Sequence, residues 1–108
     1  MSSFDGFLAN LRAKLADLLA ETIKSRRDAA AKDVESFLQE SRADLERWTR
    51  LLAQGDLSPE EFQWLVKARV DLAKMAALEQ AGLANVAMDR FKKALLGILI
   101  GSALEVFK

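Results

Sequence analysis

The stretch "QGDLSPEEF", Gln54 to Phe62, contains the clearest turn signal in the sequence. Gly55 suits the left-handed backbone conformation that commonly follows a helix. Ser58, Pro59 and Glu61 have the order of an N-cap, a first-turn proline and the acid of a capping box. One helix therefore ends before this stretch and another begins within it. So short a connection predicts that the two helices are antiparallel neighbours.

The residues before the turn predict a helix over about 4–54. Neither glycine nor proline, the two strong helix breakers, occurs between Gly6 and Gly55. The apolar pattern weakens only at Lys24–Lys32. Elsewhere apolar side chains recur in steps of three or four, which places them on one face of a helix: Phe4, Leu8, Leu11, Leu15, Leu19, Ala30, Val34, Phe37, Leu45, Trp48 and Leu52.

After the turn, the pattern predicts a second helix over about 59–107, with Gly82 as its ambiguous point. Gly82 either ends a helix, with Asn85 capping the next one, or lies inside a continuous helix at a cost of about 1 kcal/mol relative to alanine. An eleven-residue repeat keeps its phase through the glycine, along lines such as Phe62, Ala73, Ala84, Leu95 and Val106. This repeat favours a continuous helix with a nearly straight coiled-coil seam.

Two all-α arrangements are compatible with these helices. Folding the chain about residues 56 and 57 sets Trp48 opposite Leu65 and Leu15 opposite Ile98. We expect a long antiparallel helical hairpin, roughly 75 Å in length, that self-associates into a helical bundle. The alternative is a compact three- or four-helix bundle within one chain, with breaks near Arg27 and Gly82. Both form a single domain over residues 1–108.

The segment Ala94–Phe107 is unusually apolar, since Ser102 and Glu105 are its only polar side chains. Its fourteen residues are fewer than the about twenty that a membrane-spanning helix needs. The helix face that carries charges further upstream continues here as four large apolar side chains: Leu96, Ile100, Leu104 and Phe107. A helix that is apolar all round needs cover on more than one side.

This surplus of apolar surface predicts a partner. The single stripe of the first helix can cover one side of the segment, and leaving four large side chains exposed forfeits roughly 6–12 kcal/mol of burial. We expect a homodimer or higher homo-oligomer, or a helical protein partner, because two-fold self-association is the commonest arrangement. Trp64 and Met75, on a second line of the same helix, are expected to join this contact. The compact bundle would instead cover these residues within one chain.

A membrane surface is the alternative partner for the apolar segment. An interfacial helix keeps its apolar face in the lipid boundary and its basic side chains in the headgroup region. Lys92, Lys93 and Lys108 flank the segment and are expected to act as its anchors in that case.

The composition disfavours catalytic, metal-binding and nucleic-acid-binding classes. The chain has no cysteine and no histidine, so it lacks the commonest metal ligands and the usual group for proton transfer at neutral pH. Its five glycines give no phosphate-binding loop. Lysine plus arginine number 16 and aspartate plus glutamate 16, so no net charge attracts nucleic acid. We expect no catalytic residues, cofactor or metal ion.

The sequence therefore predicts a non-enzymatic helical interaction or scaffold protein that acts through oligomerisation. The alternative function is membrane interaction through residues 94–107. Residues 1–10 show no basic region followed by an apolar run, so we expect a cytoplasmic location.

Overall fold

A computed structural model describes residues 3–22 and 26–107, and every regular element in those ranges is a helix. The helices are α1 (Ser3–Thr22), α2 (Arg27–Gln54), α3 (Pro59–Leu72), α4 (Ala76–Gln80) and α5 (Asn85–Phe107). The predicted all-α fold is confirmed.

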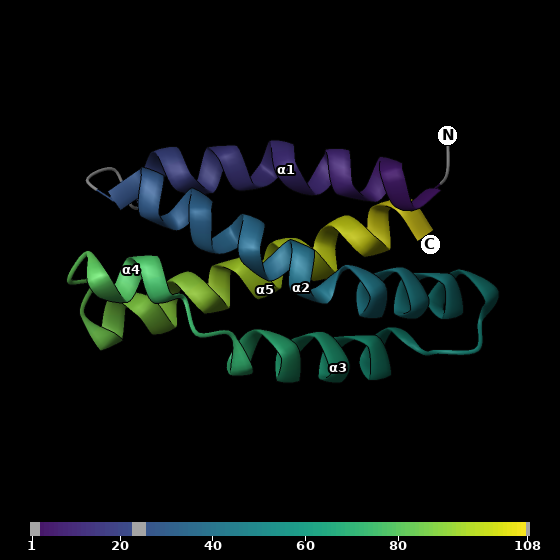
Figure 1. Cartoon of the computed structure of the whole chain (residues 1–108). Coiled ribbons are helices and arrows are strands. Elements are labelled where there is room, and N and C mark those ends of the chain that lie inside the picture. The colour runs from purple at the N-terminus through teal and green to yellow at the C-terminus, as the bar shows by residue number, and fades with distance from the viewer. Residues whose placement is uncertain (1–2, 23–25, 108) are drawn as a thin grey trace.

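The four long helices run alternately in opposite directions and form a bundle of 41 × 25 × 20 Å (Figure 1). The start of α1, the α2–α3 turn and the end of α5 lie at the same end of this bundle. Helix α5 lies between α1 and α3 and also contacts α2, so three helices cover it. The apolar C-terminal helix is therefore the central element of the fold.

The finer arrangement corrects the expected long hairpin. The helices predicted over about 4–54 and 59–107 are each interrupted: α1 ends at Thr22 and α2 begins at Arg27, and the second half is divided among α3, α4 and α5. Residues 23–25, which the first predicted helix would cross, lie outside the described residues. The chain instead forms the compact bundle with breaks near Arg27 and Gly82. Folding back gives α5 three helical neighbours in place of one, which buries more apolar surface.

The predicted turn between α2 and α3 is confirmed in detail. Gly55 has a left-handed φ of 81°, and its backbone N–H donates to carbonyls of the last turn of α2. The Ser58 hydroxyl accepts from the Glu61 backbone N–H at 3.1 Å, and the Glu61 carboxylate accepts from the Ser58 backbone N–H at 2.9 Å. Local sequence alone determines this turn, because each of these contacts joins residues a few positions apart.

A second interruption, between α3 and α4, was not predicted. Ala73 has an extended backbone, and Met75 has a left-handed φ of 48°, a conformation that costs a non-glycine residue about 1–2 kcal/mol. Asp33 of α2 offsets this by accepting the Ala77 and Leu78 backbone N–H groups at 2.9 and 2.7 Å. A distant carboxylate therefore caps α4 where the local sequence offers no capping side chain.

Helix α4 is followed by Gly82, which has a left-handed φ of 86°, and α5 begins at Asn85.

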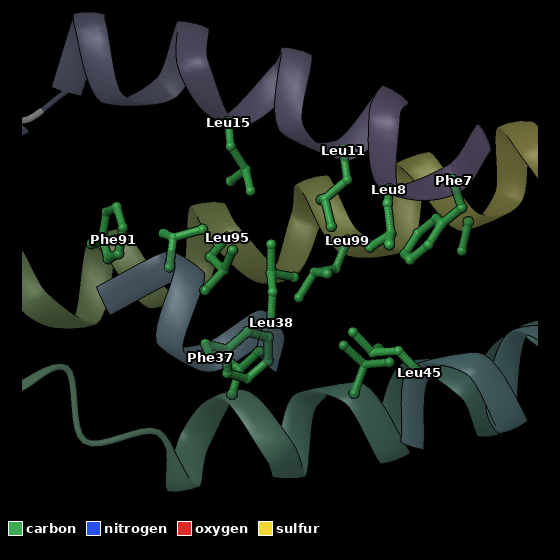
Figure 2. Packing of buried hydrophobic residues seen from close by; sticks show 14 of the residues in the cluster. Phe7, Leu8, Leu11, Leu15, Phe37, Leu38, Leu45, Phe91, Leu95 and Leu99 are labelled. Carbon is green, nitrogen blue, oxygen red and sulfur yellow. The ribbon is translucent and has the colours of Figure 1, made fainter. Parts of the chain in front are cut away.

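The hydrophobic core runs along the interior of the bundle (Figure 2). The predicted stripe of the first half supplies much of it: Phe4, Leu8, Leu11, Leu15, Ala30, Val34, Phe37, Leu45 and Leu52 are buried. Leu19 and Trp48 of the same stripe are half-buried. Helix α5 contributes Phe91, Leu95, Leu99 and Ala103, all with no exposed surface. The apolar positions of the sequence thus face one another across α1, α2 and α5.

Candidate interaction surface

The four α5 side chains predicted to need a partner are half-buried: Leu96, Ile100, Leu104 and Phe107. All four pack against the core of their own chain. The Phe107 ring lies 6.0 Å from the ring of Phe7 on α1. The bundle thus covers part of this surface internally, as the compact alternative predicted, and leaves part of each side chain accessible.

The other two predicted contact residues lie in opposite environments. Met75 is 4% exposed and belongs to the core, whereas Trp64 is 68% exposed on α3. The eleven-residue line that joined them in the sequence assumed one continuous helix. Because α3 ends at Leu72, the chain turns before Met75 and directs that side chain inward.

The outer face of α3 carries an apolar stripe that consists of Trp64, Ala68 and Leu72. These residues recur every four positions and so lie on one side of the helix. Trp64 and Leu72 are 68% and 76% exposed, and Ala68 is also exposed. The opposite side of α3 is embedded in the core through Phe62, Val66 and Val70. We call the exposed residues the α3 outer stripe.

The sequence prediction found Trp64 but missed Ala68 and Leu72. Their four-residue spacing from Trp64 was a usable signal. It was hidden because the eleven-residue repeat connected Trp64 to Met75 instead.

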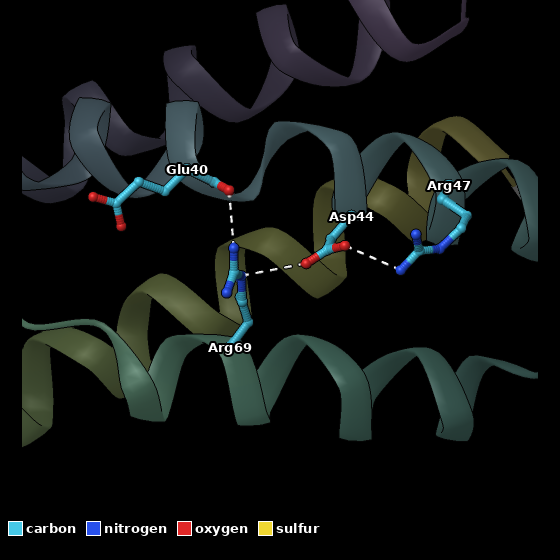
Figure 3. Close-up of polar contacts among 4 residues, drawn as sticks. All are labelled: Glu40, Asp44, Arg47 and Arg69. Atoms are coloured by element: carbon cyan, nitrogen blue, oxygen red, sulfur yellow. Dashed lines mark hydrogen bonds and ion pairs between the residues drawn. The ribbon is translucent and has the colours of Figure 1, made fainter.

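An ionic contact with α2 fixes how α3 is rotated in the bundle (Figure 3). The Arg69 guanidinium donates to the Glu40 backbone oxygen at 2.9 Å, and its Nε lies 3.5 Å from an Asp44 carboxylate oxygen. Asp44 also accepts from Arg47 at 3.0 Å. Together with the buried side of α3, these contacts hold the outer stripe toward solvent.

Charged side chains border the outer stripe on one flank. Lys67 and Asp71 form an ion pair at 2.7 Å, with the spacing of neighbours on a helix. Beyond them, a cleft of about 290 Å³ between α3 and α5 is lined by residues that include Lys92, Lys93 and Leu96. The Lys92 ammonium lies 3.4 Å from the Asp71 backbone oxygen, so this side chain reaches across to α3.

Two other clefts have mixed linings. A cleft of about 580 Å³ lies where the start of α1 meets α2 and the end of α5, and its lining includes Phe107. There the Arg42 guanidinium lies 5.2 Å from the centroid of the Phe4 ring. A cleft of about 470 Å³ lies beside the α3–α4 connection, next to Asp33. The Asp33 carboxylate already accepts two backbone N–H groups, so it serves the fold.

The Glu105 carboxylate links α5 to α1. Lys14 and Asn10 donate to its two oxygens at 2.8 and 3.1 Å, and these hydrogen bonds hold the pKa of Glu105 below its usual value. The Glu105 carboxylate is exposed and lies outside the clefts described above, so its lowered pKa reflects a polar contact between α1 and α5. Within residues 3–22 and 26–107, acidic side chains nowhere gather in a set that could hold a metal ion.

Comparison with known proteins gives no assignment. No family model, no curated protein and no solved structure matches this chain. In the part of the chain that the structure describes, every helix is too short or too polar to cross a membrane. Lys108, one of the predicted membrane anchors, lies outside the described residues. The candidate surface therefore rests on the exposure and packing of α3 and α5 alone.

Proposed function

We propose that this protein is a non-enzymatic helical interaction protein that acts by self-association. The observation that carries the proposal is the α3 outer stripe, on which Trp64 and Leu72 are 68% and 76% exposed. Tryptophan is among the residues that contribute most to binding energy at protein interfaces. Single exposed apolar residues are ordinary on protein surfaces, whereas an aligned set that includes tryptophan on one helix supports the proposed contact site.

The shape of this surface favours a protein partner over a small molecule. Small-molecule sites are concave and enclose most of the ligand, whereas the outer side of a helix is convex. A second helix can lay its own side chains alongside such a surface. The buried side of α3 and the Arg69 contacts with Glu40 and Asp44 hold the stripe in place before binding. Such preorganisation lowers the entropy cost of association.

The α5 residues have a secondary role in this proposal. Leu96, Ile100, Leu104 and Phe107 are held mainly by their own bundle, and their remaining exposure leaves a separate, partly accessible apolar surface on α5. The membrane alternative has less support, since three helices surround α5 and the Lys92 side chain lies against α3. An interfacial helix would need its apolar face free of such cover.

Sedimentation equilibrium tests the proposed function. Between about 5 and 500 µM, a range that brackets weak micromolar affinity, the average mass of the wild-type protein should rise above the monomer mass. Trp64→Glu should weaken association at least about tenfold, because a buried charge opposes contact. Ala13→Glu, at an exposed position of α1, is the matched control and should associate like wild type. A wild-type protein that stays monomeric throughout this range contradicts the proposal.

A further inference from the structure

We propose that the partner on the α3 outer stripe is a second copy of the chain, docked as an antiparallel α3–α3 pair with its two-fold axis at Ala68. This inference rests on the proposed function and specifies the geometry of the contact. The stripe is symmetric about its centre, since Trp64 lies four residues before Ala68 and Leu72 four residues after it. In an antiparallel pair, Trp64 of each copy lies opposite Leu72 of the other.

The sizes of the three side chains suit this arrangement. A two-fold interface brings its central residue against the same residue of the other copy. Ala68 is small, so the two helices can approach to the 8–10 Å interaxial distance of packed helices. The exposed indole of Trp64 and the exposed Leu72 side chain then cover each other twice, once on each side of the axis. The apolar parts of the stripe are buried together without a bulky clash at the centre.

Charges beside the stripe are also self-complementary. Lys67 and Asp71 lie on the same flank, and a two-fold axis perpendicular to the helices brings this flank of one copy against the same flank of the other. Lys67 then lies two residues along the axis from Asp71 of the second copy, and the converse pair forms as well. These two attractive pairs outnumber the single close approach of the two Lys67 side chains. The two long lysine side chains can turn outward, which reduces the repulsion between their ammonium groups.

The ends of α3 agree with the same orientation. Antiparallel helices place opposite ends of the helix dipoles side by side, which brings unlike partial charges together across the pair.

A parallel pairing of the same stripe is less favourable. It would set Trp64 against Trp64 and Leu72 against Leu72, and its two-fold axis, which runs along the helices, would place the Lys67–Asp71 flanks of the two copies on opposite sides of the contact. The attractive Lys67–Asp71 pairs of the antiparallel arrangement are therefore lost. The pattern of residues on α3 therefore selects the antiparallel orientation.

Cysteine cross-linking tests this geometry directly, because the natural chain contains no cysteine. A disulfide requires Cα atoms about 4.4–6.8 Å apart, which in a two-fold helix pair is met only near the axis. Ala68→Cys should therefore form a disulfide-linked dimer under mild oxidation. Its rate should exceed that of Ala13→Cys, an exposed alanine on α1, at least about tenfold. Adding Trp64→Glu to Ala68→Cys should remove this advantage. Circular dichroism verifies that each variant is folded.

The outcomes separate this inference from the proposed function. Equal cross-linking rates for Ala68→Cys and Ala13→Cys would overturn the α3–α3 geometry. If the wild-type protein still self-associates in sedimentation and Trp64→Glu weakens that association, the stripe docks in another orientation and the proposed function stands. If the wild-type protein is monomeric as well, both proposals fail. Rapid cross-linking of Ala68→Cys that Trp64→Glu does not slow would also overturn the geometry, since the contact would then not depend on the stripe.

Discussion

Asp33 is a buried carboxylate with a structural task. It is 7% exposed, and its two oxygens accept two N–H groups of the first turn of α4, which belong to Ala77 and Leu78. Burying an ionised group is unfavourable unless hydrogen bonds compensate it. Here the same bonds hold the left-handed Met75 and turn its side chain into the core. One residue of α2 thereby determines where the second half of the chain changes direction.

We predict that Asp33→Asn destabilises the protein by about 1–3 kcal/mol, since one acceptor oxygen is replaced by an amide that faces a backbone N–H. Urea unfolding followed by circular dichroism measures the change. Glu46→Gln, at an exposed position in the interior of the same helix, is the control and should change stability by less than about 0.5 kcal/mol. Equal effects of the two substitutions would contradict the capping role of Asp33.

Individual helices differ in how far the sequence specified them. The α2–α3 turn was predicted in detail because Gly55, Ser58 and Glu61 act on backbone groups a few residues away. The α3–α4 break was missed because the cap comes from Asp33, 44 positions from its first partner. No glycine or proline lies between Leu72 and Ala76 to mark it. Local chemistry was therefore predictable, and a break imposed by tertiary contact was not.

The same distinction explains where the predicted contact residues lie. Trp64 was predicted to lie outside the main seam, and it is 68% exposed. Met75 was placed with it only because the helix was assumed to continue, and its burial follows from the unpredicted break. The α5 residues were recognised as needing cover on several sides. Their cover within the chain depends on the bends that make α1, α2 and α3 their neighbours.

At the level of elements, two glycines should respond to alanine with opposite signs. Gly55 has a φ of 81°, so Gly55→Ala should destabilise the protein by about 1 kcal/mol. Gly97 lies within α5 with open space where a Cβ would be, so Gly97→Ala should stabilise it by about 0.5–1 kcal/mol. Urea unfolding midpoints measure both. A stability change of the same sign for both would contradict the assigned helix boundaries.

The contact of Glu105 with Lys14 and Asn10 predicts that the stability of the folded protein depends on pH. Hydrogen bonds from Lys14 and Asn10 lower the folded-state pKa of Glu105 below its usual 4.5, so the ionised carboxylate stabilises the folded state. This contribution is present above the usual pKa and is lost as the pH falls through the lowered folded-state value. We predict that Glu105→Gln slightly lowers the melting temperature at neutral pH and has no effect well below the folded-state pKa. A uniform effect at all pH values would contradict this contact.

For the whole molecule, the position of α5 gives the apolar C-terminal segment its role. An isolated hairpin would have covered α5 on one side, whereas the bundle surrounds it with α1, α2 and α3 (Figure 1). The need for a partner at Leu96, Ile100, Leu104 and Phe107 is thereby reduced. The surface that we propose for a partner therefore lies on α3, where Trp64 and Leu72 are the most exposed large apolar side chains.

The fluorescence of Trp64 tests most directly whether the α3 outer stripe is the surface of self-association. Trp48→Phe leaves Trp64 as the sole tryptophan of the chain. As the protein concentration rises from about 5 to 500 µM, its emission maximum should shift to shorter wavelength, because the indole leaves water when the copies dock. Leu72→Glu in the same background should abolish the shift. An emission maximum that stays at the wavelength of a hydrated indole while the protein self-associates would contradict the account.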